Sequence, residues 1–210
     1  MAILEHQSEV VDGYLRTAPP ASSLPWHQAS FAVLGLEATG QDQRRDQLVS
    51  VACVPVEGGK AMIGKAFEGT IGPGGVALEP IVEALTGRIV VAHGASRHMG
   101  FLSAVFGTAG LRLHGQALDT AVLAAWVPPG APADGDRSWS HADIPPGLSE
   151  AASAIGLPVH RPHEAGGEAL TTAQLFMALA SKLDQVHPQS VGSLARLCSK
   201  NGDCNQRASR

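Results

Sequence analysis

A chain of 210 residues with 44% hydrophobic content is long enough for one packed domain with extensions. The formal charge of −4 at pH 7 excludes the strongly basic surface of a dedicated, non-specific nucleic-acid binder. The three cysteines have neither CxxC nor zinc-ligand spacing, which favours a reducing compartment. No apolar run reaches the roughly 18 residues needed to span a bilayer. We therefore expect a cytoplasmic protein without a membrane partner.

The N-terminal part predicts a helical arm followed by strands. Apolar residues recur at helical spacing between residues 3 and 15, and proline and serine then mark residues 17–25 as a linker. Three strand-like runs follow, at 31–36, 47–56 and 60–71. Glu57-Gly58-Gly59 before the last run is typical of a hairpin turn. This pattern predicts a meander of three antiparallel strands.

Helices and strands alternate in the rest of the chain. The expected elements are a helix at 77–85, a strand at 88–94, and helices at 98–110, 117–127, 148–156 and 168–186. Asp119 is a good N-cap candidate, the proline- and glycine-rich segment 128–147 predicts an insertion or binding loop, and 199–210 predicts a frayed tail. The fold class is therefore α/β, with three antiparallel strands plus parallel strands in a mixed sheet flanked by helices.

Three segments, in chain order, carry the candidate site. VLGLEATG supplies Glu37, Thr39 and Gly40; AHGASRHMGFL supplies His93, Arg97 and His98; HEAGGEALTTAQLF supplies His163 and Glu168. Between roughly residues 30 and 185 these segments resemble the motif blocks of the DEDDh 3′-5′ exonucleases, which include the proofreading ε subunit of the bacterial replicative polymerase. The resemblance implies an RNase H-like fold. It also implies a division into an arm (1–25), an exonuclease-like domain (26–187) and a C-terminal extension (188–210).

The resemblance implies a role for each of these residues. His163 would be the general base and Glu37 a catalytic carboxylate. Glu37, His98 and Glu168 would stand at metal-ligand positions, and the substrate-binding positions would be Thr39, Gly40, His93 and Arg97. This sequence departs from the family at four of its expected side chains: Gly35 replaces an aspartate, and Gly94, Arg97 and His98 replace asparagine, phenylalanine and aspartate. Glu168 is longer than the usual aspartate.

The chemistry of these substitutions predicts an impaired nuclease. Phosphodiester hydrolysis of this class uses two divalent ions, and Mg²⁺ prefers hard oxygen ligands. Acids at positions i and i+2 of a strand point to the same face, so acids at 35 and 37 would converge on one ion pair. Gly35 removes one of these two carboxylates. An imidazole at His98 suits softer metals than Mg²⁺. The cofactor is therefore Mg²⁺ or Mn²⁺ if the protein is active, and otherwise none.

Several interpretations remain open. The first is a degenerate exonuclease domain that binds a nucleic-acid 3′ end, a nucleotide or a protein partner. The second is an active exonuclease in which Asp42, Asp46 or Glu164 replaces a missing acid, or in which His98 ligates a softer metal. The third is an oligomeric structural subunit that uses Trp126, Trp139 and the proline-rich loop. Arg44, Arg45, Arg97 and Arg161 are expected at the same end of the sheet, where they would meet phosphates or form a solvated surface.

Overall fold

A computed structural model describes residues 2–71, 78–108, 110–113, 115–127 and 146–207. Its sheet has six strands: β1 (Ser30–Ala38), β2 (Leu48–Glu57), β3 (Lys60–Ala61), β4 (Phe67–Thr70), β5 (Ile89–Ala92) and β6 (Leu118–Asp119). Five of them follow one another in the order β3-β2-β1-β5-β6, and the sixth, β4, pairs with β2. β2 is antiparallel to β1, β3 and β4, whereas β5 is parallel to β1 and β6. The predicted mixed α/β sheet is confirmed.

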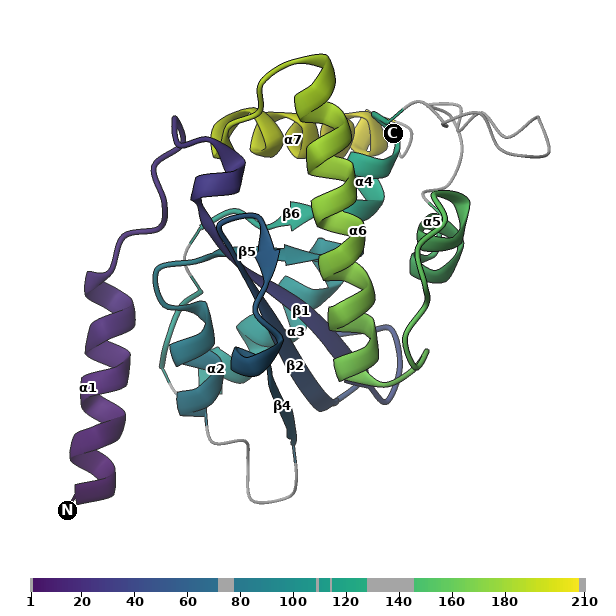
Figure 1. Ribbon diagram of the computed structural model, residues 1–210. Coiled ribbons are helices and arrows are strands. Elements are labelled where there is room, and N and C mark those ends of the chain that lie inside the picture. Colours follow the sequence, from purple (N-terminus) through teal and green to yellow (C-terminus); the bar gives the residue numbers. More distant parts are fainter. Residues whose placement is uncertain (1, 72–77, 109, 114, 128–145, 208–210) are drawn as a thin grey trace.

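Helices cover both faces of this sheet (Figure 1). The helices are α1 (Ala2–Arg16), α2 (Leu78–Leu85), α3 (Ala95–Thr108), α4 (Thr120–Ala124), α5 (Leu148–Ala154), α6 (Ala165–Val186) and α7 (Val191–Arg207). Helix α6 lies along β1 and β2 on one face, together with α4, α5 and α7. Helices α1, α2 and α3 contribute to a second apolar core on the opposite face.

Strand β1 supplies side chains to both cores because successive residues of a strand point to opposite faces. Phe31 and Val33 pack in the core that contains α6, and Phe31 meets the ring of Phe176 on α6 at a centroid distance of 4.7 Å. Leu34 and Leu36 pack in the other core. All four are almost completely buried, so β1 is the centre of the domain and the site at its end stands on a rigid element.

Several expected elements differ in detail. The third strand is not continuous: a 3-10 turn at Ile63–Lys65 separates β3 from β4, and Lys65 in this turn pairs with Glu57 at 2.7 Å. The expected helix at 117–127 begins as strand β6, and only then continues as α4. The expected frayed tail is wrong for residues 199–207, which continue α7. The predicted loop at 128–147 lies outside the described residues up to position 145.

Both terminal segments pack against the core. Tyr14 on α1 is buried and meets the ring of Phe106 on α3 edge to face. Pro25 forms a β-bridge with Ser190, and Leu194 on α7 is fully buried. Among the described helices, none is both long and apolar enough to cross a membrane.

Candidate functional site

The C-terminal ends of the parallel strands bring candidate residues to one edge of the sheet. Glu37 lies near the end of β1, His93 directly follows β5, and Asp119 ends β6. Because β1, β5 and β6 run in the same direction, these ends meet at one edge, where open α/β sheets commonly bind ligands.

Three of the predicted site residues, Glu37, Arg97 and His163, lie within electrostatic reach of a fourth, Glu168. Burial raises the pKa of Glu168 above its ordinary value, and the negative charge of Glu37 raises it further. The positive charges of Arg97 and His163 act in the opposite direction. The structure thus groups Glu37, Arg97, His163 and Glu168 in one region, although they come from β1, α3, the loop before α6 and the first turn of α6.

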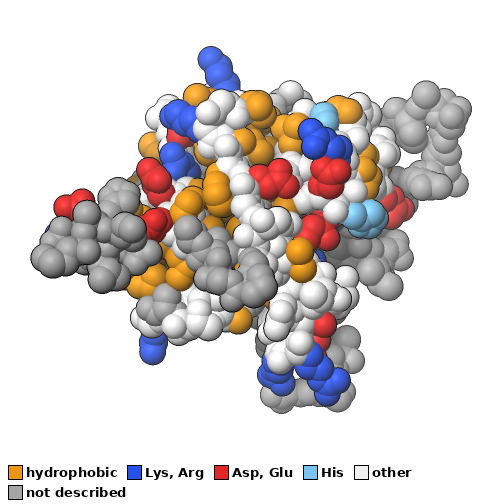
Figure 2. Space-filling view, turned by 90° about the horizontal axis from the view of Figure 1, so that it is seen from below, with side chains coloured by type: hydrophobic (Ala, Val, Ile, Leu, Met, Phe, Trp, Pro, Cys, Tyr) orange, Lys and Arg blue, Asp and Glu red, His pale blue; other side chains and the backbone are white. Residues whose placement is uncertain are grey.

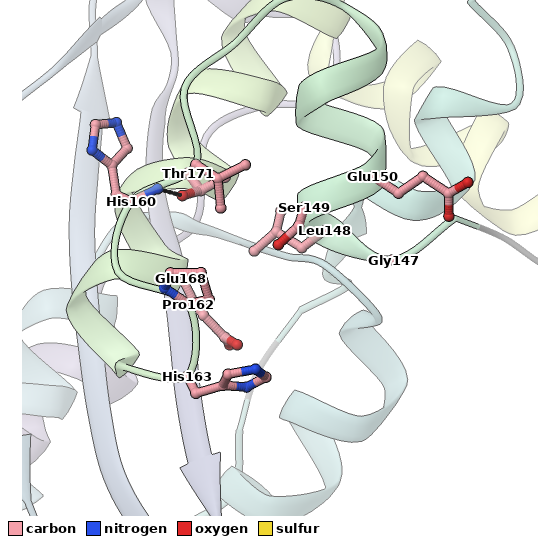
Figure 3. A pocket seen from close by; sticks show the side chains of 10 residues that line it. Gly147, Leu148, Ser149, Glu150, His160, Pro162, His163, Glu168 and Thr171 are labelled. Carbon is pink, nitrogen blue, oxygen red and sulfur yellow. Dashed lines mark hydrogen bonds between the residues drawn. The ribbon is translucent and has the colours of Figure 1, made fainter.

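His163 and Glu168 line a pocket of about 330 Å³. The remaining lining residues are Gly147, Leu148, Ser149, Glu150, Val159, His160, Pro162 and Thr171. Figure 3 shows the side chains of His163 and Glu168 pointing toward one another, with Ser149 of α5 across from them. His163 is exposed and has a φ of 64°, in the left-handed region that non-glycine residues rarely occupy. Such backbone strain is frequent at functional sites.

The start of α6 is held by contacts that the motif comparison did not identify. The carboxylate of Glu68 on β4 accepts a hydrogen bond from the backbone N–H of Gly166 at 3.3 Å. A Cβ on Gly167 would collide with the carbonyl oxygens of His160 and Arg161. The glycine pair therefore lets both β4 and the preceding loop approach the helix. No local pattern marks Glu68, because strand pairing alone brings it there.

Gly35 has no space for a side chain. A Cβ at this position would collide with the carbonyl oxygen of Ala165 and would lie 2.6 Å from the backbone nitrogen of Ala169. Real Cβ atoms essentially never approach backbone atoms this closely. Helix α6 therefore lies directly on β1 at the position where the family carries its first aspartate.

His98 is the fourth residue of α3, so it lies in the first turn of a helix that begins at Ala95. It is 5% exposed, and its Nδ1 donates to the carbonyl oxygen of Gly94 at 3.2 Å. Burial lowers its pKa to about 4, and the neighbouring charges of Arg97 and Asp119 have opposing effects. The imidazole is therefore neutral at physiological pH and is enclosed by protein.

His93 and Asp119 form the packing beneath this site. His93 accepts a hydrogen bond from the Thr120 hydroxyl at 2.9 Å and donates to the carbonyl oxygen of Pro146 at 2.8 Å. Burial lowers the pKa of His93. Asp119 accepts from the backbone N–H groups of Gly94, Ala95 and Ala121, and so caps α4 as expected and also holds the start of α3.

Thr39 and Gly40 belong to the turn between β1 and β2. The Thr39 hydroxyl accepts from the backbone N–H of Gln47 at 2.9 Å, which closes this turn. The carbonyl oxygen of Gly40 accepts from Nη2 of Arg97 at 3.2 Å. Of these two predicted substrate residues, Gly40 contacts Arg97, one of the charged residues around Glu168. Thr39 is exposed and stabilises the turn.

The acids considered as replacement ligands have other partners. Asp46 accepts from the backbone N–H of Asp42 at 2.8 Å, and Asp42 lies 3.7 Å from the guanidinium of Arg45. Glu164 pairs with Arg161 at 3.1 Å. Within the part of the chain that the structure describes, no three His, Cys, Asp or Glu side chains are grouped so that they could hold one metal ion.

The surface around the lower end of the molecule is electrically mixed. The face seen from below in Figure 2 carries acidic, basic and histidine side chains next to one another, with apolar side chains between them. This distribution agrees with the small negative net charge. A continuous basic track of the kind that follows a nucleic-acid backbone is absent from the described surface in this view.

Comparisons with known proteins establish the fold. No protein family and no curated protein matches the sequence. The structure is similar to that of E. coli Exonuclease I in complex with a dT13 oligonucleotide, with a TM-score of 0.53, 12% identity, and coverage of 76% of this chain and 42% of that chain. An apo Exonuclease I structure gives a TM-score of 0.51 at 13% identity, with coverage of 76% and 43%. An Exonuclease I complex with SSB-Ct gives 0.52 at 12%, with coverage of 76% and 42%.

This chain therefore matches less than half of the length of these nucleases. At such low identity the similarity concerns the fold, and the activity has to be argued from the residues themselves. The chain has an exonuclease-like, RNase H-like fold.

Proposed function

We propose that this chain is an exonuclease-like domain of the DEDDh type that binds a nucleotide or a nucleic-acid 3′ end and has little or no nuclease activity. The observation that carries this proposal is the contact of helix α6 with Gly35. An acid at position 35 would require the helix backbone to move. The missing carboxylate is thus part of how the domain is packed.

The remaining residues do not fit a centre with two divalent ions. Such a centre places two ions about 3.5–4 Å apart among several carboxylates. Glu37 and Glu168 alone offset about half of the charge of two Mg²⁺ ions, and a buried neutral imidazole at His98 stands where a further acid is expected. The guanidinium of Arg97 adds positive charge to the same region, which disfavours a nearby cation further.

The features that remain are suited to binding. The pocket beside His163 and Glu168 combines hydrogen-bonding side chains with the apolar groups of Leu148 and Val159, as small-molecule sites commonly do. Exonuclease I of the same fold has been captured with single-stranded oligonucleotides and with SSB-Ct. By analogy, we propose the terminal nucleotide of a single strand as the ligand of this site, and a protein partner as a second binding function of the domain.

A nuclease assay over a panel of metals tests this proposal. Single-stranded DNA and RNA with a 5′ label are incubated with the full chain in Mg²⁺, Mn²⁺, Zn²⁺ or EDTA, beside a Glu37→Ala variant. We expect no 3′ shortening above the level of the variant, together with measurable binding of the same oligonucleotides. Metal-dependent shortening that is lost in Glu37→Ala would establish an active exonuclease with rebuilt metal ligation and overturn the proposal.

A further inference from the structure

Residues 22–26, which precede β1, are joined to the first turn of α7 by backbone hydrogen bonds. The N–H of Val191 donates to the carbonyl oxygen of Leu24 at 3.0 Å, and the N–H of Gly192 donates to that of Ser22 at 2.7 Å. The first N–H groups of a helix have no partner inside the helix, so these two carbonyl oxygens complete the start of α7. Figure 1 shows this segment beside the start of α7. We call residues 22–26 together with α7 the terminal clasp.

The terminal clasp fits closely at Gly192 but has few buried anchors. A Cβ on Gly192 would lie 2.9 Å from the carbonyl oxygen of Ser22 and 3.0 Å from its Cβ. Among the side chains of α7 that the structure describes, those of Val191 and Leu194 are buried, whereas α6 buries eleven residues. Elements with few buried contacts open at a lower free energy than the core does. We therefore expect α7 to detach before the sheet unfolds.

Helix α7 also supports the edge of the sheet. The N–H of Asp119, the last residue of the edge strand β6, donates to Sγ of Cys198 on α7 at 3.4 Å. The carboxylate of the same aspartate accepts from the N–H groups of Gly94 and Ala95 at 2.9 and 2.8 Å. Cys198 thus contacts the residue that holds the start of α3, the helix that carries Arg97.

We propose that the terminal clasp is a conformational control of this edge of the sheet: it opens as one unit while the central strands stay folded, and its opening releases Asp119 and the start of α3. Opening breaks the bonds between residues 22–26 and α7 and the bond from Asp119 to Cys198. Whatever displaces α7 therefore loosens the support of Arg97. This inference goes beyond the proposed function, because it holds whether or not the site binds a nucleotide.

Amide hydrogen exchange of the full chain, followed by nuclear magnetic resonance over a series of low urea concentrations, tests this inference. The four reporters are the amides of Val191, Asp119, Gly94 and Ala95, and the reference for global unfolding is Val33, which pairs with strands on both sides. A local opening exposes little surface, so exchange of the four reporters should depend only weakly on urea. Exchange of the reference should show the full urea dependence of unfolding.

Gly192→Ala strains the terminal clasp directly. It should accelerate exchange of all four reporters by the same factor, about tenfold, and leave the amide of Met62 in a remote turn unchanged. Alanine favours a helix more than glycine does, so faster exchange reports the lost fit with Ser22 and not a weaker helix. Arg196→Ala changes an exposed side chain on the same helix and is the control, which should exchange as the unsubstituted chain does.

Two results would overturn the inference. The first is exchange at the sheet edge, at Asp119, Gly94 and Ala95, that follows the reference in urea or stays unchanged in Gly192→Ala. The second is exchange of Val191 that also follows the reference, since α7 would then have no opening of its own. The urea series on the unsubstituted chain decides the question if Gly192→Ala does not fold. No nucleotide is present in this experiment, so neither result bears on the proposed function.

Discussion

A methyl group at position 35 has no room in the folded protein, so Gly35→Ala tests the contact between β1 and α6 directly. The added Cβ would lie 2.6 Å from the nitrogen of Ala169 and 3.1 Å from the carbonyl carbon of Ala165. Favourable contacts between such atoms lie at about 3.5–4.0 Å, so the helix would have to retreat by about 1 Å. Both atoms belong to helix backbone and cannot rotate away as a side chain can.

We expect Gly35→Ala to lower the free energy of unfolding by about 1–3 kcal/mol, the usual range for overpacking in a core. Retreat of α6 would loosen its contacts with Phe31 and Val33, which share its core. Gly35→Asp should be more damaging, because it adds the same collision and buries a carboxylate, which costs several kcal/mol unless it is paired. Introducing the aspartate of the exonuclease motif at position 35 should therefore destabilise the domain sooner than it creates a metal site.

Urea denaturation followed by circular dichroism measures both effects. Gly107→Ala is the control: Gly107 lies in helix α3, and a Cβ there would meet nothing within 4 Å. This control should be neutral or stabilising by up to about 1 kcal/mol, because alanine favours helix. If Gly35→Ala were as stable as the control, α6 would not lie on β1 as described, and the packing argument against an acid at this position would fail.

Further predictions concern the buried polar groups around the site. His98 is neutral in the folded protein with a pKa of about 4 but takes up a proton near pH 6.5 when unfolded, so its contribution to stability is present above pH 6.5 and is lost as the pH falls toward 4. The loss of stability is on the order of 3 kcal/mol. Between pH 7 and pH 4.5, His98→Leu should therefore lose less free energy of unfolding than the unsubstituted chain, as measured by urea denaturation. Equal losses in the two proteins would contradict this prediction. Asp119→Ala leaves three backbone N–H groups without their acceptor and should destabilise by about 2–4 kcal/mol, with Asp119→Asn intermediate; thermal unfolding that is unchanged in both would refute the capping role. Burial and the charge of Glu37 raise the pKa of Glu168 in the folded protein above its value in the unfolded chain. The protonated carboxyl therefore contributes stability at low pH, and this contribution is lost as the pH rises through the folded-state pKa. Glu168→Gln should therefore be more stable than the unsubstituted chain at pH 7 and not at pH 4, and the opposite pH dependence in denaturation curves would count against the grouping of these charges.

The periodicity of the sequence predicted the mixed α/β class and most of its longer elements, but not the interruption between β3 and β4 or the short strand β6. Alternating apolar residues predicted β1 and β2, and helical spacing predicted α2 and α6 to within a few residues. Asp119 was recognisable as a cap because capping depends on residues close in sequence. Helix starts were less accurate: α6 begins at Ala165, before the predicted position, since Gly166 and Gly167 weaken the local helical signal although the fold uses both.

The site depended more strongly on tertiary structure. The resemblance to the exonuclease motif blocks selected Glu37, Arg97, His163 and Glu168, and in the fold the first three lie within electrostatic reach of Glu168. Only the packing of α6 revealed that Gly35 is a contact point between helix and strand as well as a missing acid.

The positions of two further residues were decided in the same way. His98 is an enclosed neutral imidazole and Glu68 an anchor for the start of α6, and neither role is visible in a local pattern. The physical reason is that periodicity reports which face of an element a residue occupies, whereas burial, pKa and close backbone approach depend on elements far away in the chain. Sequence determined which groups meet at the edge of this sheet, and tertiary structure decided which of them remain exposed, charged and available to a ligand.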